Sequence, residues 1–149
     1  MRLSDAEMDA RVATAPVARL ATVASDGTPH VVPVVFVVVG GDLWSPVDGK
    51  PKGKASLARL RNIAERPHAS LLVDRYDDDW RALWWIRIDV LASVVAGAVL
   101  EPTMFRDVCD ALRRKYPQYA ATPLFSDTPT LVRLVPLRRV GWAATTPLA

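Results

Sequence analysis

The sequence predicts a small, mostly antiparallel β-barrel with helices outside it, an α+β fold. Two observations support this. Segments with the composition of strands outnumber helical ones, and most of them are joined by short turns, as in hairpins. Half of the 149 residues are apolar, which is enough to fill one core, so one domain over 1–149 is expected. The expected order is helix, three strands, helix, two strands, helix and strand, which gives six strands.

The chain is expected to begin with a short helix from Ser4 to Thr14. Ser4 suits the N-cap position, and Glu7 stands where a capping box requires a carboxylate. Pro16 then ends the helix. Three strands, separated by turn signals at 25–28 and 40–41, are expected next: Val17–Ala24, Val31–Val39 and Leu43–Ser45.

The second of these strands, Val31–Val39, is an almost unbroken apolar run. Such a strand is buried on both faces, in a barrel interior or at a contact between subunits. Pro33 lies inside the run, and because proline has no N–H it requires a bulge or a sheet edge. The run is far shorter than the roughly 18 residues that cross a bilayer, so no membrane span is expected.

Two further helices are expected in the rest of the chain. Leucine and isoleucine recur at helical spacing from about Ala55 to Glu65, and Pro67 ends that helix. Pro102 opens the next helix, and Pro117 follows its end. One face of this last helix is apolar and comprises Phe105, Val108, Leu112 and Tyr116.

Three strands are expected around these helices. Ala69–Tyr76 is a short strand. In Trp84–Ala98 every even position is apolar, which predicts a strand long enough to curve around a barrel. Thr130–Trp142 is the last strand, and it should bend at Pro136.

The composition excludes several classes of site. One cysteine and two histidines cannot build a disulfide framework or a Cys/His zinc site. The first residues turn acidic where a signal peptide would turn apolar, so a reducing cytoplasm is the expected setting.

No Ser/His/Asp set or carboxylate pair is evident, so in an enzyme a bound cofactor would carry the chemistry. No catalytic side chain is assigned. His30 stays open as a proton donor, and Cys109 is expected in the core.

A lysine-rich loop is the strongest local feature. Three of the four lysines, Lys50, Lys52 and Lys54, alternate between a strand end and a helix start. Neighbouring glycines allow a ligand to approach the backbone, and the helix start adds partial positive charge, so an anion site is indicated. The aspartates at 74–79 disfavour nucleic acid, and a small phosphorylated ligand fits better. The alternative is that these lysines are solvated loop charges.

Tryptophans gather just beyond the acidic segment, in Asp79–Trp85. Trp84 and Trp85 point to opposite faces of a strand, where they can fill the core and a dimer contact. Trp80 lies in the polar turn before that strand, so it is the better candidate for stacking on a ligand ring.

A resemblance emerges from an ordered set of short stretches that covers nearly the whole chain. These are Ala18–Val23 with Asp26–His30, Val47–Lys52, Leu60–Ile63 with Pro67, Leu71–Tyr76, Asp79–Trp85, Lys115–Tyr119 and Val140–Trp142. In this order they resemble the split β-barrel flavin and deazaflavin oxidoreductases, the superfamily of pyridoxamine 5′-phosphate oxidase. The chain is most similar to the actinobacterial group assigned to coenzyme F420.

This resemblance implies a six-stranded antiparallel split barrel of the FMN-binding type, which forms a homodimer with two cofactor sites at the subunit interface. The implied contacts are Ser45, Lys50, Lys52, Lys54 and Arg59 for the cofactor phosphate, backbone groups of Val32, Pro33 and Val34 for the ring system, and Arg75 and Trp80, contributed by the partner subunit, for its cover.

One departure from the oxidase bears on the ligand. Where the oxidase has Ser-Arg-Lys, this chain reads Lys50-Pro51-Lys52, so pyridoxamine phosphate is not the expected substrate. A lysine-rich loop suits a cofactor with a long anionic tail, such as coenzyme F420. The expected function is therefore hydride transfer from the reduced deazaflavin to a small organic acceptor. The alternatives are an FMN-dependent oxidoreductase of the same fold and a non-catalytic cofactor- or heme-binding protein.

Overall fold

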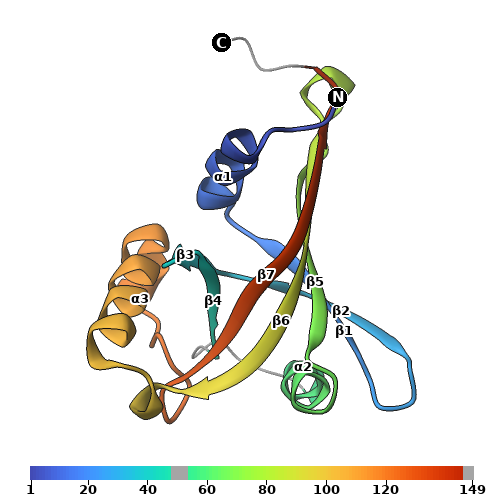
Figure 1. The fold of residues 1–149 in the computed structure, drawn as a ribbon. Helices are drawn as coiled ribbons and strands as arrows, with labels where there is room; N and C mark the ends of the chain where they lie inside the picture. Colours follow the sequence, from blue (N-terminus) through green and yellow to red (C-terminus); the bar gives the residue numbers. More distant parts are fainter. Residues whose placement is uncertain (48–53, 146–149) are drawn as a thin grey trace.

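The computed structural model describes residues 1–47 and 54–145, without the side chains of residues 54–57. In this part of the chain seven strands form one sheet in the order β2-β1-β5-β6-β7-β4-β3, and every neighbouring pair is antiparallel. The predicted mostly β fold with antiparallel pairing is confirmed (Figure 1). The strands are β1 (Ala18–Val23), β2 (Pro29–Val34), β3 (Val37–Val39), β4 (Asp42–Pro46), β5 (His68–Arg75), β6 (Trp84–Ala96) and β7 (Thr130–Ala143).

The described strands number seven instead of the predicted six because the run Val31–Val39 is not one strand. It is divided by a corner at Val35 and Phe36 into β2 and β3, which lie at opposite ends of the strand order. A link of two residues reaches only about 10 Å, so the sheet must curl until its two edges approach each other there. The result is a barrel-like sheet that hydrogen bonds do not close. Pro33 lies on the edge strand β2, one of the two positions that its missing N–H allows.

Residues at the end of the helix that spans Pro102–Lys115 hold the corner between β2 and β3 in place. The backbone N–H of Phe36 donates to Tyr116 Oη (3.0 Å), and Lys115 Nζ donates to Phe36 O (2.9 Å). The side chain of Phe36 is fully buried. Because an unpaired buried N–H is costly, these contacts keep the corner bent away from a continuous strand.

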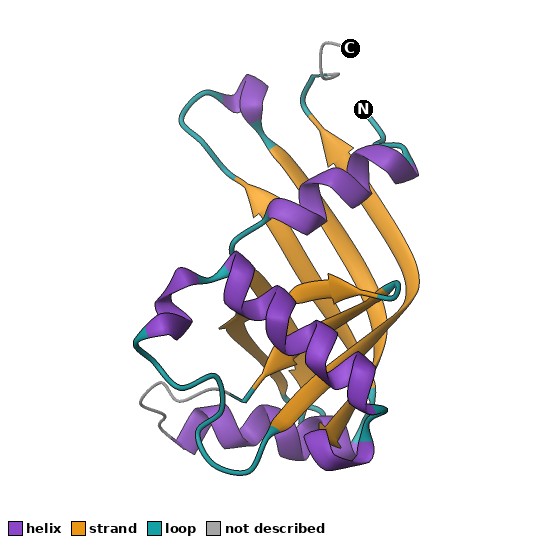
Figure 2. Cartoon of the chain, turned by 90° about the vertical axis from the view of Figure 1, so that its left-hand side faces the viewer, coloured by secondary structure: helices purple, strands orange, loops and turns teal. Residues whose placement is uncertain are grey.

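The helices lie outside the curled sheet (Figure 2). The three α-helices are α1 (Asp5–Thr14), α2 (Lys54–Glu65) and α3 (Pro102–Lys115), and short 3-10 turns occur at Trp80–Ala82, Gly97–Val99 and Pro117–Ala120. The predicted capping box of the first helix is confirmed, since Ser4 Oγ accepts from Glu7 N (3.3 Å) and Glu7 Oε2 accepts from Ser4 N (2.7 Å). No helix in the described ranges is long and apolar enough to cross a membrane.

The longest strands give the sheet its curvature. β7 pairs with β6 along almost its whole length and with β4 near its start, so it belongs to both halves of the sheet. The predicted bend at Pro136 is present as a β-bulge, in which Leu137 has no partner on β6. The alternation predicted for β6 holds through Ala92, but Val94 is exposed and the strand ends at Ala96, before a 3-10 turn.

The core consists of two clusters of buried side chains. One fills the space between the sheet and α1, with Leu20, Ile86 and Ile88 among its members. The other, centred on Trp44 and Leu112, lies between α3 and the β3–β4 hairpin. β4 contributes to both clusters, with Leu43 in the first and Trp44 in the second, and its end at Pro46 precedes the lysine-rich segment in the sequence.

Candidate functional site

The lysine-rich segment lies in the sequence between the end of β4 and the start of α2. The prediction that it follows a strand and precedes a helix is therefore confirmed. Ser45 is buried on β4 opposite Val132 of β7. Val47 N donates to Thr130 O (3.0 Å), which ties the end of β4 to the start of β7. Of the predicted phosphate-binding residues, Lys50 and Lys52 lie outside the described residues, as does the side chain of Lys54.

Two polar residues of α2, Arg59 and Asn62, are buried, and Asn62 joins the helix to the sheet. Arg59 is buried, with 8% of its surface exposed, which is rare for an arginine and restrains its side chain. Asn62, one turn further on, is also buried and donates from Nδ2 to Thr22 Oγ1 (3.1 Å). Sequence reasoning missed the contact between Asn62 and Thr22, although Thr22 follows Ala18 and Leu20 on the buried face of β1. A polar residue on such a face needs a partner, and that signal was available.

The three residues predicted to line a ring system lie together on β2. Val34 is buried, Val32 is half-buried and Pro33 is exposed. The outer edge of β2 pairs with no strand in residues 1–47 and 54–145, so backbone groups along it are open to a ligand.

His30 lies on the same strand, opposite the buried Thr22. Its Nδ1 is buried and has no hydrogen-bond partner among the residues that the structure describes. Buried polar atoms are almost always paired, so this nitrogen is suited to a contact with a bound group. Cys109, by contrast, is buried in the second cluster as predicted, and desolvation raises the pKa of its thiol, so it is a poor nucleophile.

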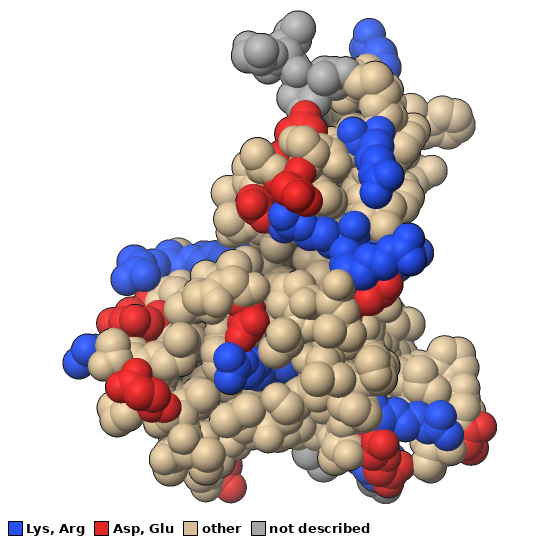
Figure 3. Space-filling model, in the orientation of Figure 1, with Lys and Arg blue, Asp and Glu red and all other residues tan. Residues whose placement is uncertain are grey.

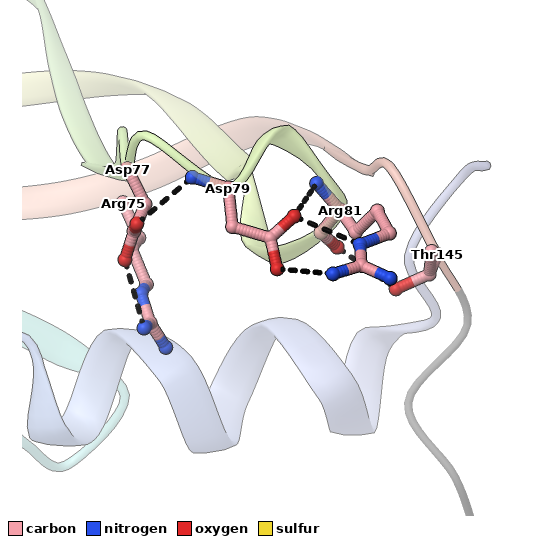
Figure 4. Close-up of polar contacts among 5 residues, drawn as sticks. All are labelled: Arg75, Asp77, Asp79, Arg81 and Thr145. Carbon is pink, nitrogen blue, oxygen red and sulfur yellow. Dashed lines mark hydrogen bonds and ion pairs between the residues drawn. The ribbon is translucent and has the colours of Figure 1, made fainter.

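Arg75 and Trp80 lie at the turn between β5 and β6. Figure 4 shows how the carboxylates of Asp77 and Asp79 order this turn. Arg75 Nη2 forms an ion pair with Asp77 Oδ2 (3.0 Å), and Asp77 Oδ1 accepts from Asp79 N (3.1 Å). Asp79 in turn accepts from the backbone and the guanidinium of Arg81. The hydrogen bond from Asp79 N lowers the pKa of Asp77, and that from the Arg81 side chain lowers the pKa of Asp79. The turn is thus ordered, while Trp80 stays 72% exposed.

The structure does not bring Arg75 and Trp80 close to α2, the helix that follows the lysine-rich segment in the same chain. β5 begins just after α2 and runs for eight residues, roughly 25 Å, to Arg75. The β5–β6 turn and α2 therefore lie at opposite ends of the molecule (Figure 1).

Sequence reasoning also missed a small basic pocket beside Arg75. Arg11 of α1 and Arg81 line it together with Arg75, around a cavity of about 190 Å³. The Arg11 guanidinium lies 5.6 Å from the ring centre of Trp84, which forms another wall. Arg75 and Arg81 belong to the same turn, but Arg11 is more than 60 residues away in the sequence, so no local pattern could have added it to them.

A family model described as pyridoxamine 5′-phosphate oxidase matches residues 4–136. Among solved structures, the heme storage protein HutZ from Vibrio cholerae has a TM-score of 0.70 at 18% identity, covering 96% of this chain and 95% of that one. A FAD-binding protein from Mesorhizobium loti has a TM-score of 0.67 at 19% identity, covering 95% and 93%. A structure described as an F420 reductase has a TM-score of 0.63 at 20% identity, covering 88% and 94%.

At these identities the structural likeness shows the fold alone. No curated protein matches the sequence. The three structural neighbours are described by three different ligands, so the shared fold does not select one of them.

Proposed function

Because the chain belongs to the pyridoxamine 5′-phosphate oxidase family, we propose that it is an oxidoreductase that uses coenzyme F420 and transfers a hydride between the reduced deazaflavin and a small organic acceptor. The observation that carries the proposal is the lysine-rich segment between β4 and α2, with three ammonium groups at alternate positions. A cofactor with several anionic groups needs such a set of cations.

The atoms that the structure describes near this segment fit a cofactor of this kind. Ser45 and Arg59 lie on the elements that flank the lysines, and both residues are buried. Because burial restrains their side chains, the hydroxyl and the guanidinium are held in place to contact anionic oxygens of a ligand. The unpaired edge of β2 and the unpartnered Nδ1 of His30 offer polar contacts to a ring system.

In this proposal the lysines with Ser45 and Arg59 hold the phosphate, and the backbone of Val32–Val34 orients the ring. When bound, the deazaflavin supplies the hydride. The side chains of the protein position the two reactants and exclude water, so no covalent catalyst is needed. No residue is assigned as the proton donor, although His30 lies on the strand that would line the ring.

Side-by-side titration of the purified protein with coenzyme F420, FMN and heme tests the proposal. Coenzyme F420 is expected to bind more tightly than FMN by at least tenfold, or about 1.4 kcal/mol, because its longer anionic tail meets more cations. Fluorescence of the cofactor measures both flavin-type affinities, and the heme absorption band measures the third. Equal or reversed affinities for the two flavin-type cofactors would favour the FMN-dependent alternative. Tight binding of heme alone would favour the non-catalytic one.

We further propose that the protein is a homodimer and that Trp80 and Arg75 of one subunit cover the cofactor held by the other. The separation of these residues from α2, which follows the lysine-rich segment, within one chain supports this arrangement. Without a second copy, the exposed indole at the β5–β6 turn would have no ring to stack on.

The outer face of the sheet suits a contact between two copies. Cross-strand neighbours place several apolar side chains on it, among them Leu72 and the adjacent pair Trp85 and Trp142. Leu72 and Trp142 are both almost 40% exposed. The arginines on this face are balanced by carboxylates: Arg19 pairs with Asp74 (3.1 Å), and Arg87 with Asp89 (3.5 Å). An apolar surface with paired charges can be buried at low electrostatic cost.

Leu72→Arg is the expected dimer-breaking substitution. The new guanidinium would lie between Arg19 and Arg87, whose carboxylates are already engaged, so two copies would bring unpaired like charges together. We expect the dimer dissociation constant to rise by at least about 100-fold in analytical ultracentrifugation. The variant should keep the circular dichroism spectrum of the wild type, because Leu72 lies outside the core of each subunit, while its melting temperature falls as the stabilising subunit contact is lost. A wild-type protein that sediments as a monomer would contradict the proposal, as would a variant that still dimerises normally.

A further inference from the structure

Lys115 ends α3 with its ammonium group half-buried against the β2–β3 corner. Nζ donates to Phe36 O (2.9 Å) and lies 3.9 Å from the centre of the Phe36 ring. Within residues 1–47 and 54–145, no carboxylate comes within ion-pair distance of this nitrogen. Burial lowers the pKa of Lys115 to about 8. A half-buried cation that faces no anion of its own chain is well placed to accept one from a ligand.

Lys115 borders a groove that runs between α3 and α1. Together with Arg114 it flanks an opening of about 310 Å³, whose other walls include Ala13 and Val38. Ala13 and Val38 also line a larger cavity of about 570 Å³ beneath α1, so the two spaces adjoin. Figure 3 shows the surface indented between α1 and α3, with basic side chains beside the indentation.

The larger cavity is mainly apolar. Its apolar walls include Val12 of α1, Leu43 of β4, Ile88 of β6 and Pro136 of β7. The ion pair of Asp9 and Arg139 forms a charged part of the lining. Its volume lies within the range of roughly 300–1,000 Å³ that is usual for small-molecule sites.

The charges at the two ends of the groove are not equivalent. At the α1 end Arg139 forms ion pairs with Asp5 (3.1 Å) and Asp9, so its charge is balanced. At the α3 end Lys115 and Arg114 stand side by side, and no ion pair is recorded for either within the described part of the chain. A ligand complementary to this groove has an apolar body and one anionic end.

We propose that the groove between α1 and α3 binds an organic carboxylate, with its carboxylate on Lys115 and Arg114 and its apolar body in the cavity beneath α1. The proposal stands apart from the cofactor site, because it uses neither the lysine-rich segment nor β2. A concave opening with a larger cavity beside it accommodates a small molecule better than the flat surface of a second copy.

Calorimetric titration with octanoate, compared with 1-octanol, tests the site in the purified full-length protein without added cofactor. The two probes have the same chain length and differ in charge. Octanoate is expected to bind at least tenfold more tightly than octanol, since only octanoate engages the cations. Equal affinities, or no binding of octanoate, would overturn the proposal.

Lys115→Met separates the cationic contribution from the apolar one. We expect octanoate affinity to fall about tenfold and octanol affinity to stay the same. The variant should fold, because Tyr116 Oη lies 3.0 Å from both Phe36 O and Pro16 O and can direct its one proton to Phe36 O when the ammonium group is removed. Its melting curve checks this. If the folded variant binds octanoate as the wild type does, the carboxylate does not lie on Lys115 and the proposal fails.

Ala13→Trp tests the apolar part with a matched control. Ala13 is exposed and borders both spaces, so an indole there should block the groove and abolish binding of both probes. Ala10→Trp places the same side chain at an exposed position one turn earlier on α1 and should leave both affinities unchanged. Equal losses in the two variants would contradict the proposed location. So would a change in the sedimenting mass caused by Ala13→Trp, which would indicate that a second copy covers the groove.

Discussion

Replacing Trp44 with alanine is expected to lower the free energy of unfolding by about 3–5 kcal/mol. Trp44 is fully buried on β4 and is the largest side chain in the cluster beneath α3. Its Nε1 donates to Val39 O (3.1 Å), and the guanidinium of Arg133 lies 5.0 Å from its ring centre. The substitution removes the packing of a whole ring system and leaves a cavity that the surrounding strands cannot close. Urea denaturation measures the loss.

Two variants make this prediction specific. Trp44→Phe keeps an aromatic ring but loses the hydrogen bond to Val39 O, so a smaller loss of about 1–2 kcal/mol is expected. Trp80→Ala removes the same side chain from an exposed position and should change stability by less than about 0.5 kcal/mol. If Trp80→Ala destabilises the protein as much as Trp44→Ala does, Trp80 belongs to the packing of the fold and cannot serve as a free stacking surface.

The double substitution Lys50→Ala with Lys52→Ala is expected to weaken binding of coenzyme F420 by about 3–6 kcal/mol. Each ammonium group that the ligand buries contributes about 1.5–3 kcal/mol through a charged hydrogen bond. The free energy of unfolding should stay within about 0.5 kcal/mol of the wild type, because in this proposal the two ammonium groups serve the ligand and not the packing of the fold. Fluorescence titration of the cofactor measures the affinity, and urea denaturation measures the stability.

The control for this prediction removes the same number of charges elsewhere. Arg106→Ala with Arg113→Ala takes two exposed cations from α3 and should reduce cofactor affinity by less than about threefold, since surface charges at a distance are screened by salt. Equal losses in the two double variants would mean that the protein attracts the cofactor through its overall charge. An unchanged affinity in the lysine variant would mean that the loop is solvated.

Most of the individual elements could be predicted from the sequence because their signals are local. The capping box of Ser4 and Glu7 sets the start of α1, and the alternation of apolar residues from Trp84 to Ala92 sets which face of β6 is buried. Proline marked the bend of β7 at Pro136 and the edge position of Pro33. In each case a side chain acts on the backbone within a few residues of itself.

The corner at Val35 and Phe36 could not be predicted in this way. All the residues from Val31 to Val39 apart from Pro33 are apolar and have strand propensity, so no local signal divides the run. The corner exists because Tyr116, 80 residues away, pairs with the backbone of Phe36. The same limit applies to Asn62 and Thr22, which are 40 residues apart and meet only once α2 lies on β1.

The sequence alone determined the fold class, the lysine-rich segment and the elements on either side of it, because hydrophobic periodicity, turn residues and clustered charge are properties of neighbouring residues. Only the tertiary structure decided that the sheet curls with β2 and β3 at its edges, and that Trp80 lies at the other end of the molecule from α2. It also decided that the amine of Lys115 borders a groove and, within residues 1–47 and 54–145, forms no ion pair with a carboxylate. These features depend on which distant segments pack together, since burial and charge pairing are set by the whole fold and not by the chain near each residue.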